Sequence, residues 1–225
     1  IISGGRFSMR KKLTMVLSLI IIISLLLTGC GGKGGDSKTS GGEVSGTTAK
    51  KDTLNYGIGA EPTSLDPSIS NDLVSYSVVH QLYDYLIVYR PDGTITPGLA
   101  ESWELSEDGT EMTFHLREGV KFHNGDTMTS EDVAFSLNNA IQSPHTVSVT
   151  SAMDSAEVID ENTVVLKLKH PFGPIEYCVA ASQMGIVNKS EYEKNPDGYG
   201  KNPIGTGPYK FVEWKSGDQI KLEAF

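Results

Sequence analysis

An apolar run near the N-terminus most constrains what this chain can fold into, because it decides where the rest of the chain folds. The run covers residues 13–27 and follows a short basic start, residues 9–12. Its 15 residues are fewer than the roughly 18 that a membrane-spanning helix needs. A basic start, an apolar run and small residues before a cleavage point are typical of a secretory signal peptide. We therefore interpret residues 9–29 as a signal peptide and expect the body to fold after export.

The signal ends in Leu27-Thr28-Gly29-Cys30, which resembles a lipobox. The resemblance implies that a diacylglycerol is placed on Cys30 and that the peptide is cut just before it. The alternative is an ordinary signal peptide, or an uncleaved anchor helix, that happens to end in cysteine. Residues 1–8 precede Met9 and are interpreted as an upstream artefact.

Residues 30–51 are expected to form a flexible linker after the lipidated cysteine. Residues 31–51 contain seven glycines, six serines or threonines and no aromatic residue. Such a composition buries too little surface to fold. A coil of about 20 residues has a root-mean-square reach of roughly 25 Å. The linker would let a globular body, residues 52–225, move above the membrane.

Charge and cysteine content exclude some classes of protein. Removal of residues 1–29 takes away four basic and no acidic residues, which leaves 15 basic against 28 acidic residues. An acidic body argues against nucleic acid as a partner. If Cys30 carries lipid, Cys178 has no partner within the chain, so the body is expected to have no disulfide. Cys178 lies in an apolar stretch and is interpreted as a buried, inert thiol.

The patterning of residues 52–225 mixes hairpins with helices and predicts an α+β body. A capping box of Thr129 and Asp132 predicts a helix over 130–141. Alternation at Leu54, Tyr56 and Ile58 predicts a first strand. The other predicted strands are 86–89, 100–105, 112–117, 157–159, 163–169, 185–187, 209–214 and 219–223. The other predicted helices are one capped by Asn71 or Asp72 and running to about Tyr83, one over 175–181 and a short one capped by Ser190.

No catalytic or metal-binding arrangement is found in the sequence. The five histidines are not at metal-ligand spacing with one another or with cysteine. Neither a phosphate-binding loop nor a Gly-x-Ser-x-Gly elbow occurs. His115 is expected to be solvated, and Trp103, Phe114 and Phe135 are assigned to core packing. The chain is therefore not expected to be an enzyme or to need a cofactor or metal.

Several stretches, in order, resemble the family 5 extracellular solute-binding proteins, which serve dipeptide, oligopeptide and nickel importers of the ATP-driven (ABC) class. The longest is an ordered block over residues 97–137. The two others are Glu61-Pro62-Thr63-Ser64-Leu65-Asp66-Pro67 and Asn202-Pro203-Ile204-Gly205-Thr206-Gly207-Pro208-Tyr209. The resemblance runs from about Leu54 to the last residue.

The resemblance implies a two-lobed fold of the periplasmic-binding-protein type II kind, which closes on its ligand without catalysis. Relatives continue into a second large lobe, so this chain is expected to be an N-terminal fragment, truncated after the first lobe and its inserted hairpin subdomain. In those terms lobe I comprises residues 52–74 and 170–225, and the inserted subdomain comprises residues 75–169.

The resemblance also places the ligand beside the loop after the first strand, at Ala60, Glu61, Pro62 and Thr63. An extended loop with Pro62 exposes main-chain groups that can pair with a peptide as a strand does. The alternative is that the prolines only shape a turn. The Gly205-Thr206-Gly207-Pro208 loop is expected to be a structural corner.

The expected function is a membrane-anchored, monomeric binding component that captures peptides for the permease and ATPase subunits of an importer. It would sit at the outer face of the cytoplasmic membrane, or on the periplasmic side if the host has an outer membrane. Nickel chelate, haem, glutathione or oligosaccharide are alternative cargoes. A truncated surface lipoprotein for adhesion or signalling, or a pseudogene product that binds nothing, is the alternative from another class.

Overall fold

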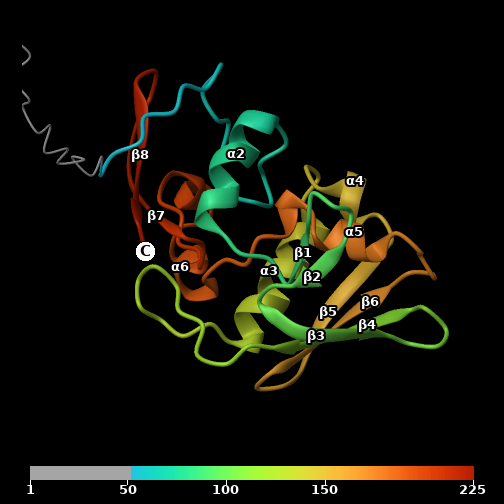
Figure 1. Cartoon of the computed structure of the whole chain (residues 1–225). Coiled ribbons are helices and arrows are strands. Elements are labelled where there is room, and N and C mark those ends of the chain that lie inside the picture. Colours follow the sequence, from blue (N-terminus) through green and yellow to red (C-terminus); the bar gives the residue numbers. More distant parts are fainter. Residues whose placement is uncertain (1–51) are drawn as a thin grey trace, which may run out of the picture. The chain divides into compact units, whose positions relative to one another are not determined.

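The computed structural model describes residues 52–225, so Cys30, the signal peptide and the linker predictions lie outside the described residues. The chain divides into two units, Ile1–Leu54 and Asn55–Phe225. The second unit carries the helices and strands given below (Figure 1).

The described residues form short helices and antiparallel hairpins. The helices are α2 (Leu73–Leu82), α3 (Ser130–Gln142), α4 (Val147–Thr150), α5 (Ile175–Val179) and α6 (Lys189–Lys194), with 3-10 turns at Ser182–Met184 and Pro196–Lys201. The strands are β1 (Ile87–Tyr89), β2 (Ile95–Pro97), β3 (Ala100–Leu105), β4 (Glu111–Leu116), β5 (Met153–Asp160), β6 (Thr163–Leu168), β7 (Tyr209–Lys215) and β8 (Gln219–Ala224).

A four-stranded antiparallel sheet with the order β3-β4-β6-β5 supports the larger core. The alternation predicted for β4 is confirmed, since Met112, Phe114 and Leu116 are buried while His115 is exposed. Helix α3 packs against β5 and β6 and contributes Val133, among others, to the same core. One face of the sheet is therefore dry and covered, as a half-buried antiparallel sheet requires.

Helix α3 begins where the sequence predicts. The Thr129 side chain accepts from the Asp132 N–H, and the Asp132 carboxylate accepts from the Thr129 N–H, so the capping box is present. Asp132 also accepts from the Lys189 N–H at 2.9 Å. The first turn of α3 therefore also fixes the start of α6.

A smaller core lies beside α2, where Leu65, Val79, Tyr83, Val187 and Tyr192 are buried together. Partly buried side chains of the β7–β8 hairpin pack against this cluster. In Figure 1 the hairpin and α2 lie on the same side of the unit, away from the four-stranded sheet.

Two predicted strands are wrong. Residues 54–58 form no strand: their backbone is not hydrogen-bonded to any described strand, and Tyr56 is 79% exposed. Residues 185–187 run as an irregular segment, in which the Ile186 N–H donates to the Asp84 carbonyl. Short apolar runs do not reveal whether a partner strand is within reach.

The N-cap of α6 is also corrected. Asn188, not Ser190, caps the helix, because its side chain accepts from the Glu191 N–H. Strands β1, β3, β6, β7 and β8 and helices α2 and α5 lie where they were predicted, within a few residues. Strand β2 and helix α4 were not predicted.

Candidate functional site

The segment before the predicted ligand loop is irregular, bends at Gly59 and Ala60, and is open. From Gly57 to Glu61, no backbone N–H or C=O is hydrogen-bonded to another described residue. The side chains of Tyr56 and Ile58 are exposed. Unpaired main-chain groups on an exposed segment are free to pair with a ligand's main chain.

The Glu61 carboxylate is held by the turn between β7 and β8. Its Oε1 accepts from Trp214 Nε1 at 2.7 Å, and its Oε2 accepts from Ser216 Oγ at 3.0 Å and from the Gly217 N–H at 3.2 Å. The hydrogen bond from Ser216, followed by that from Trp214, lowers the pKa of Glu61 below its ordinary value. The carboxylate is therefore ionised at neutral pH and joins two segments that are far apart in the sequence.

Lys201 lies over the face of the Trp214 ring, whose N–H donates to Glu61. Its Nζ is 3.2 Å from the centroid of the Trp214 ring, which is a cation–π arrangement. Lys201 also adds a smaller electrostatic contribution to the lowered pKa of Glu61. Lysine, indole and carboxylate thus form one cluster.

Of the other residues of the loop, Pro62 is buried, Thr63 is anchored by hydrogen bonds and Ala60 is exposed. The Thr63 N–H donates to Ser75 Oγ at 3.0 Å, and Thr63 Oγ1 donates to Asp72 Oδ2 at 2.8 Å. Ala60 is exposed and lies at the end of the open segment. The loop is therefore tied to the N-terminus of α2 at Thr63 and to the β7–β8 turn at Glu61.

A buried carboxylate follows the loop. Asp66 is fully buried and accepts from Ser68 and, at 2.8 Å, from the Tyr192 hydroxyl. Burial raises the pKa of Asp66 above its ordinary value. Leu65 is fixed beside it, since its N–H donates to the Gly200 carbonyl and its carbonyl accepts from Tyr83 Oη at 3.0 Å.

The glycine loop at 205–207 packs against the end of α2, which agrees with its predicted role as a corner. A Cβ at Gly205 or Gly207 would collide with backbone atoms of Leu82, so glycine is required for this approach. His123 holds the corner from the other side, with Nδ1 accepting from the Gly205 N–H at 3.2 Å and Nε2 3.0 Å from the Gly207 carbonyl. Thr206 Oγ1 donates to Asp84.

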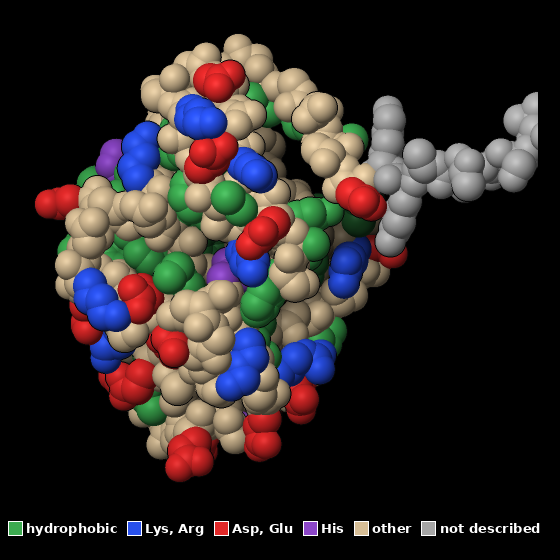
Figure 2. Space-filling model, turned by 90° about the vertical axis from the view of Figure 1, so that its left-hand side faces the viewer, with side chains coloured by type: hydrophobic (Ala, Val, Ile, Leu, Met, Phe, Trp, Pro, Cys, Tyr) green, Lys and Arg blue, Asp and Glu red, His purple; other side chains and the backbone are tan. Residues whose placement is uncertain are grey.

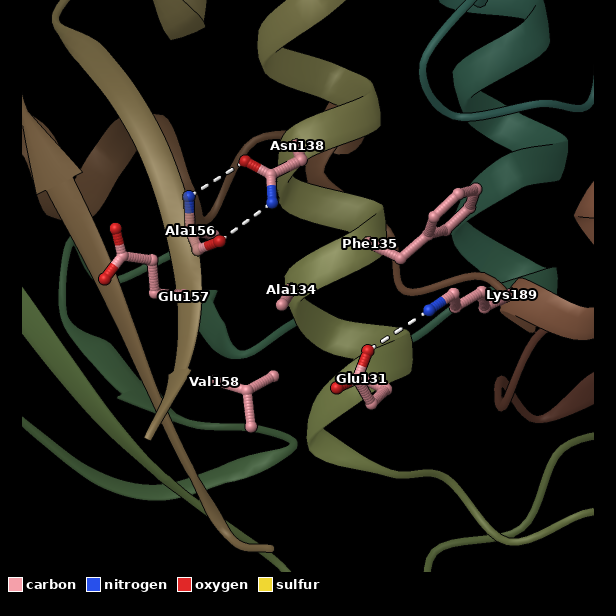
Figure 3. Close-up of a pocket in the computed structure, with 8 residues that line it drawn as sticks. All are labelled: Glu131, Ala134, Phe135, Asn138, Ala156, Glu157, Val158 and Lys189. Carbon is pink, nitrogen blue, oxygen red and sulfur yellow. Dashed lines mark hydrogen bonds and ion pairs between the residues drawn. The ribbon is translucent and has the colours of Figure 1, made fainter. Parts of the chain in front are cut away.

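A shallow hollow of about 500 Å³ lies between α3 and β5 (Figure 3). Phe135 and Val158 form apolar parts of its lining, and the Glu131–Lys189 ion pair lies at one side. The Asn138 side chain bridges to the backbone of Ala156 across the hollow (Figure 3). The hollow is far in sequence from the predicted ligand loop and contains no residue of it.

Hydrophobic, acidic and basic side chains are interspersed on the face shown in Figure 2, with no gathering of basic residues.

No group of three histidine, cysteine or carboxylate residues within 52–225 could hold a metal ion. None of the helices formed by residues 52–225 is long and apolar enough to cross a bilayer. Cys178 is half-buried, and burial raises its thiol pKa.

The aromatic residues assigned to the core divide into two kinds. Phe114 is fully buried, as expected. Trp103 is only partly buried, and its Nε1 donates to Glu176 Oε1 at 2.6 Å. Phe135 is partly buried, packs against Tyr192 and also lines the hollow beside α3.

The sequence missed the partners of Glu61. Trp214, Ser216 and Lys201 lie about 140 to 155 residues further along the chain. The one available signal was a tryptophan two residues before a Ser-Gly turn. Nothing in that pattern indicates a carboxylate partner.

Comparison with known proteins identifies the family. Residues 94–225 match the family model for bacterial extracellular solute-binding proteins, family 5. The chain belongs to this family. Its mixed α/β fold is that of the family's periplasmic binding proteins.

Three family relatives illustrate the similarity. The oligopeptide-binding protein OppA of Bacillus subtilis is 30% identical over 95% of this chain and 42% of its own length. The structure of AgaA from A. tumefaciens R10, in complex with agropinic acid, is 36% identical, with a TM-score of 0.67 over 74% of this chain and 34% of AgaA. The periplasmic binding protein DppA of Helicobacter pylori, in complex with the peptide STSA, is 30% identical, with a TM-score of 0.66 over 74% of this chain and 38% of DppA. This family 5 chain therefore spans less than half the length of these relatives.

Proposed function

We propose that this chain is the N-terminal part of the substrate-binding component of an ABC importer, and that the component captures peptides. The observation that carries the proposal is the open main chain of residues 57–61, which ends in an anchored loop inside a family 5 fold. A peptide in extended conformation can pair with such a segment as a strand does. The component would deliver its cargo to permease and ATPase subunits and act as a monomer.

The contact residues proposed on this chain are Ala60, Glu61, Pro62 and Thr63. Their backbone groups, together with those of Gly57 to Gly59, would face the ligand. The remaining contacts would come from the second lobe that the relatives' greater length implies. Lobe I is proposed as residues 52–74 and 170–225, with residues 75–169 as the inserted subdomain.

A second candidate is the same transport role with a cargo other than a peptide. It is favoured by the 36% identity to AgaA, whose structure holds agropinic acid. A main-chain segment can bind many polar solutes, so the loop by itself does not select peptides.

Mass spectrometry of the cargo tests the proposal and separates the two candidates. The whole protein is purified without added ligand, denatured, and the released small molecules are identified. Peptides at close to one per protein are expected. An opine, a metal chelate or a saccharide in place of peptides would overturn the peptide cargo and support the second candidate. A protein that releases nothing and binds no peptide when titrated would overturn the transport proposal.

We also propose that lipid on Cys30 holds the protein at the outer face of the cytoplasmic membrane. The support is the order of basic start, apolar run, small residues and cysteine, followed by a glycine-rich linker. Two acyl chains would anchor the protein stably, whereas an acidic body has no electrostatic attraction to an anionic membrane.

Metabolic labelling with palmitate tests the anchor. The Cys30→Ser variant is expected to incorporate no label and to leave the membrane fraction or stay unprocessed. Cys178→Ser is the matched control and should label like the wild type. Undiminished labelling of the Cys30→Ser variant would overturn the anchor.

A further inference from the structure

We infer that Glu61 is a positioning residue that clamps the proposed ligand loop to the β7–β8 turn, with Trp214 and Lys201 as the other parts of the clamp. The inference deepens the proposed function and rests on it for its consequence in binding. Its structural content, the clamp itself, stands on the contacts of the described residues.

The first argument is that both oxygens of the exposed carboxylate are already hydrogen-bonded within the protein. Each oxygen of Glu61 accepts at least one hydrogen bond from the hairpin, at 2.7 to 3.2 Å. Three donors converge on it: an indole N–H, a hydroxyl and a backbone N–H. Hydrogen bonds to an ionised acceptor are the stronger kind. A ligand group that replaced these donors would have to match all three.

The second argument is the cation on the far side of the indole. Lys201 lies over the Trp214 ring at 3.2 Å, while the ring's N–H points to Glu61. The indole is therefore held between a cation at its face and an anion at its edge. Both interactions favour the same orientation of the ring.

The third argument is that the loop has a second anchor only two residues away. Thr63 is tied to Asp72 and Ser75 at the start of α2. Buried Pro62 lies between the two anchors and restricts the backbone there. The clamp at Glu61 therefore sets the direction in which the open segment from Gly57 to Ala60 leaves the fold.

It follows that Glu61 acts on ligands through the geometry of the main chain and not through its charge. Loss of Trp214 should then weaken binding in the same way as loss of Glu61 but by less, because Ser216 and Gly217 still hold Glu61. A Glu61 that contacted the ligand directly would instead matter whether or not Trp214 is present.

The clamp is tested first without ligand, by the indole N–H signals in a ¹H–¹⁵N spectrum. The Trp214 signal is assigned with Trp214→Phe. In Glu61→Ala this signal should shift and exchange with water at least about tenfold faster, because it loses its acceptor. Trp103, which donates to Glu176, is the internal reference and should not change. The heteronuclear NOE of the Ala60 amide should fall.

Glu213→Ala is the matched control. It removes an acidic residue from the same hairpin, where Glu213 pairs only with Lys215 and Gln219. It should leave the Trp214 signal and the Ala60 NOE as in the wild type. An unshifted Trp214 signal in Glu61→Ala would overturn the clamp.

Binding is tested with a mixed library of natural tripeptides, from which the member best retained by the whole wild-type protein is titrated. Glu61→Ala should weaken its affinity roughly tenfold, as expected when a charge-assisted anchor is lost. Trp214→Phe should weaken it less, because Ser216 and Gly217 still donate to Glu61. The double variant should be no weaker than Glu61→Ala alone. The melting temperature should change no more than in Glu213→Ala.

Additive losses in the double variant would overturn the positioning role, because they would assign Glu61 and Trp214 separate contacts with the ligand. A wild-type protein that retains neither a tripeptide nor a longer peptide would overturn the proposed peptide cargo. The indole and NOE measurements would still decide whether the clamp exists.

Discussion

At the scale of single residues, the structure assigns a protonation state to His123. The Gly207 carbonyl can only accept, so Nε2 carries the proton, and Nδ1 must be free to accept from the Gly205 N–H. Burial lowers the pKa of His123, while the Gly207 carbonyl and Asp84 oppose this and Lys210 adds to it. A second proton, on Nδ1 of His123, would make Nδ1 a donor that faces the Gly205 N–H, so this hydrogen bond would be lost.

We predict that stability falls as the pH is lowered through the histidine range. A lowered folded-state pKa means that the unfolded chain binds more protons, so the contribution of His123 is fully present above pH about 6.5 and is lost as the pH falls through the lowered pKa. His123→Gln keeps an acceptor and a donor but does not titrate. Urea denaturation at pH 8 and pH 5 should show a smaller loss for His123→Gln than for the wild type.

His80 also has a pKa lowered by burial, so part of the pH dependence should remain in His123→Gln. His115→Gln, at an exposed position, is the control and should follow the wild type. Identical pH dependence in His123→Gln and the wild type would contradict the prediction.

At the scale of elements, β5 shows how an edge strand is closed. Strand β5 is the outer strand of the sheet and faces α3. The Asn138 side chain accepts from the Ala156 N–H at 2.9 Å and donates to the Ala156 carbonyl at 2.8 Å. The amide thus takes the place of one residue of a neighbouring strand (Figure 3). Unpaired edges are sites of unwanted pairing, and this contact covers one of them.

We predict that Asn138→Ala destabilises the fold by about 1–3 kcal/mol, because it leaves a donor and an acceptor of Ala156 unsatisfied. The Ala156 amide should also exchange with solvent faster. Urea denaturation and hydrogen exchange measure the two effects. Glu157 follows Ala156 in β5, and Glu157→Gln affects only an exposed ion pair with Lys167 of β6, so it should change stability by less than about 1 kcal/mol. Unchanged exchange at Ala156 would show that the amide pair does not protect the edge.

At the scale of the whole unit, buried polar groups connect segments that are distant in the chain. Asp66 and Tyr192 are 126 positions apart and are joined by a hydrogen bond of 2.8 Å. Tyr83 reaches the Leu65 carbonyl, and Asn139 of α3 donates to Ser68. The ligand loop is thus continuous with a buried network that ties α2, α3 and α6 together.

We predict that Tyr192→Phe destabilises the protein by about 1–3 kcal/mol at pH 7, because a buried carboxylate loses a donor. The raised pKa of Asp66 means that burial favours its protonated form, whose stabilising contribution is lost as the pH rises through that pKa. The Tyr192 hydroxyl supports the ionised form, so the cost of Tyr192→Phe should shrink as the pH is lowered towards 4. Urea denaturation across this range measures it. Tyr56→Phe, at an exposed position, should show no effect, and an equal cost at both pH values would contradict the prediction.

Local patterns alone determined much of this protein. Alternation in β4, the capping box at Thr129 and Asp132, and the turn before β8 are set by neighbours in sequence, so they could be predicted. The family could be predicted too, because its ordered stretches are read directly from the chain. The signal peptide and the lipidation of Cys30 remain predictions that rest on sequence.

Only the tertiary structure decided what depends on distant partners. Residues 54–58 have the pattern of a strand, yet their backbone is hydrogen-bonded to no described strand. Asn188 caps α6 although Ser190 looked equally suitable. Glu61 was predicted in the ligand loop, but its engagement with Trp214 and the turn at Ser216 could not be foreseen. The physical reason is that the strength of a hydrogen bond does not depend on how far apart its partners are in the sequence. Only the folded chain determines which groups come within hydrogen-bonding distance.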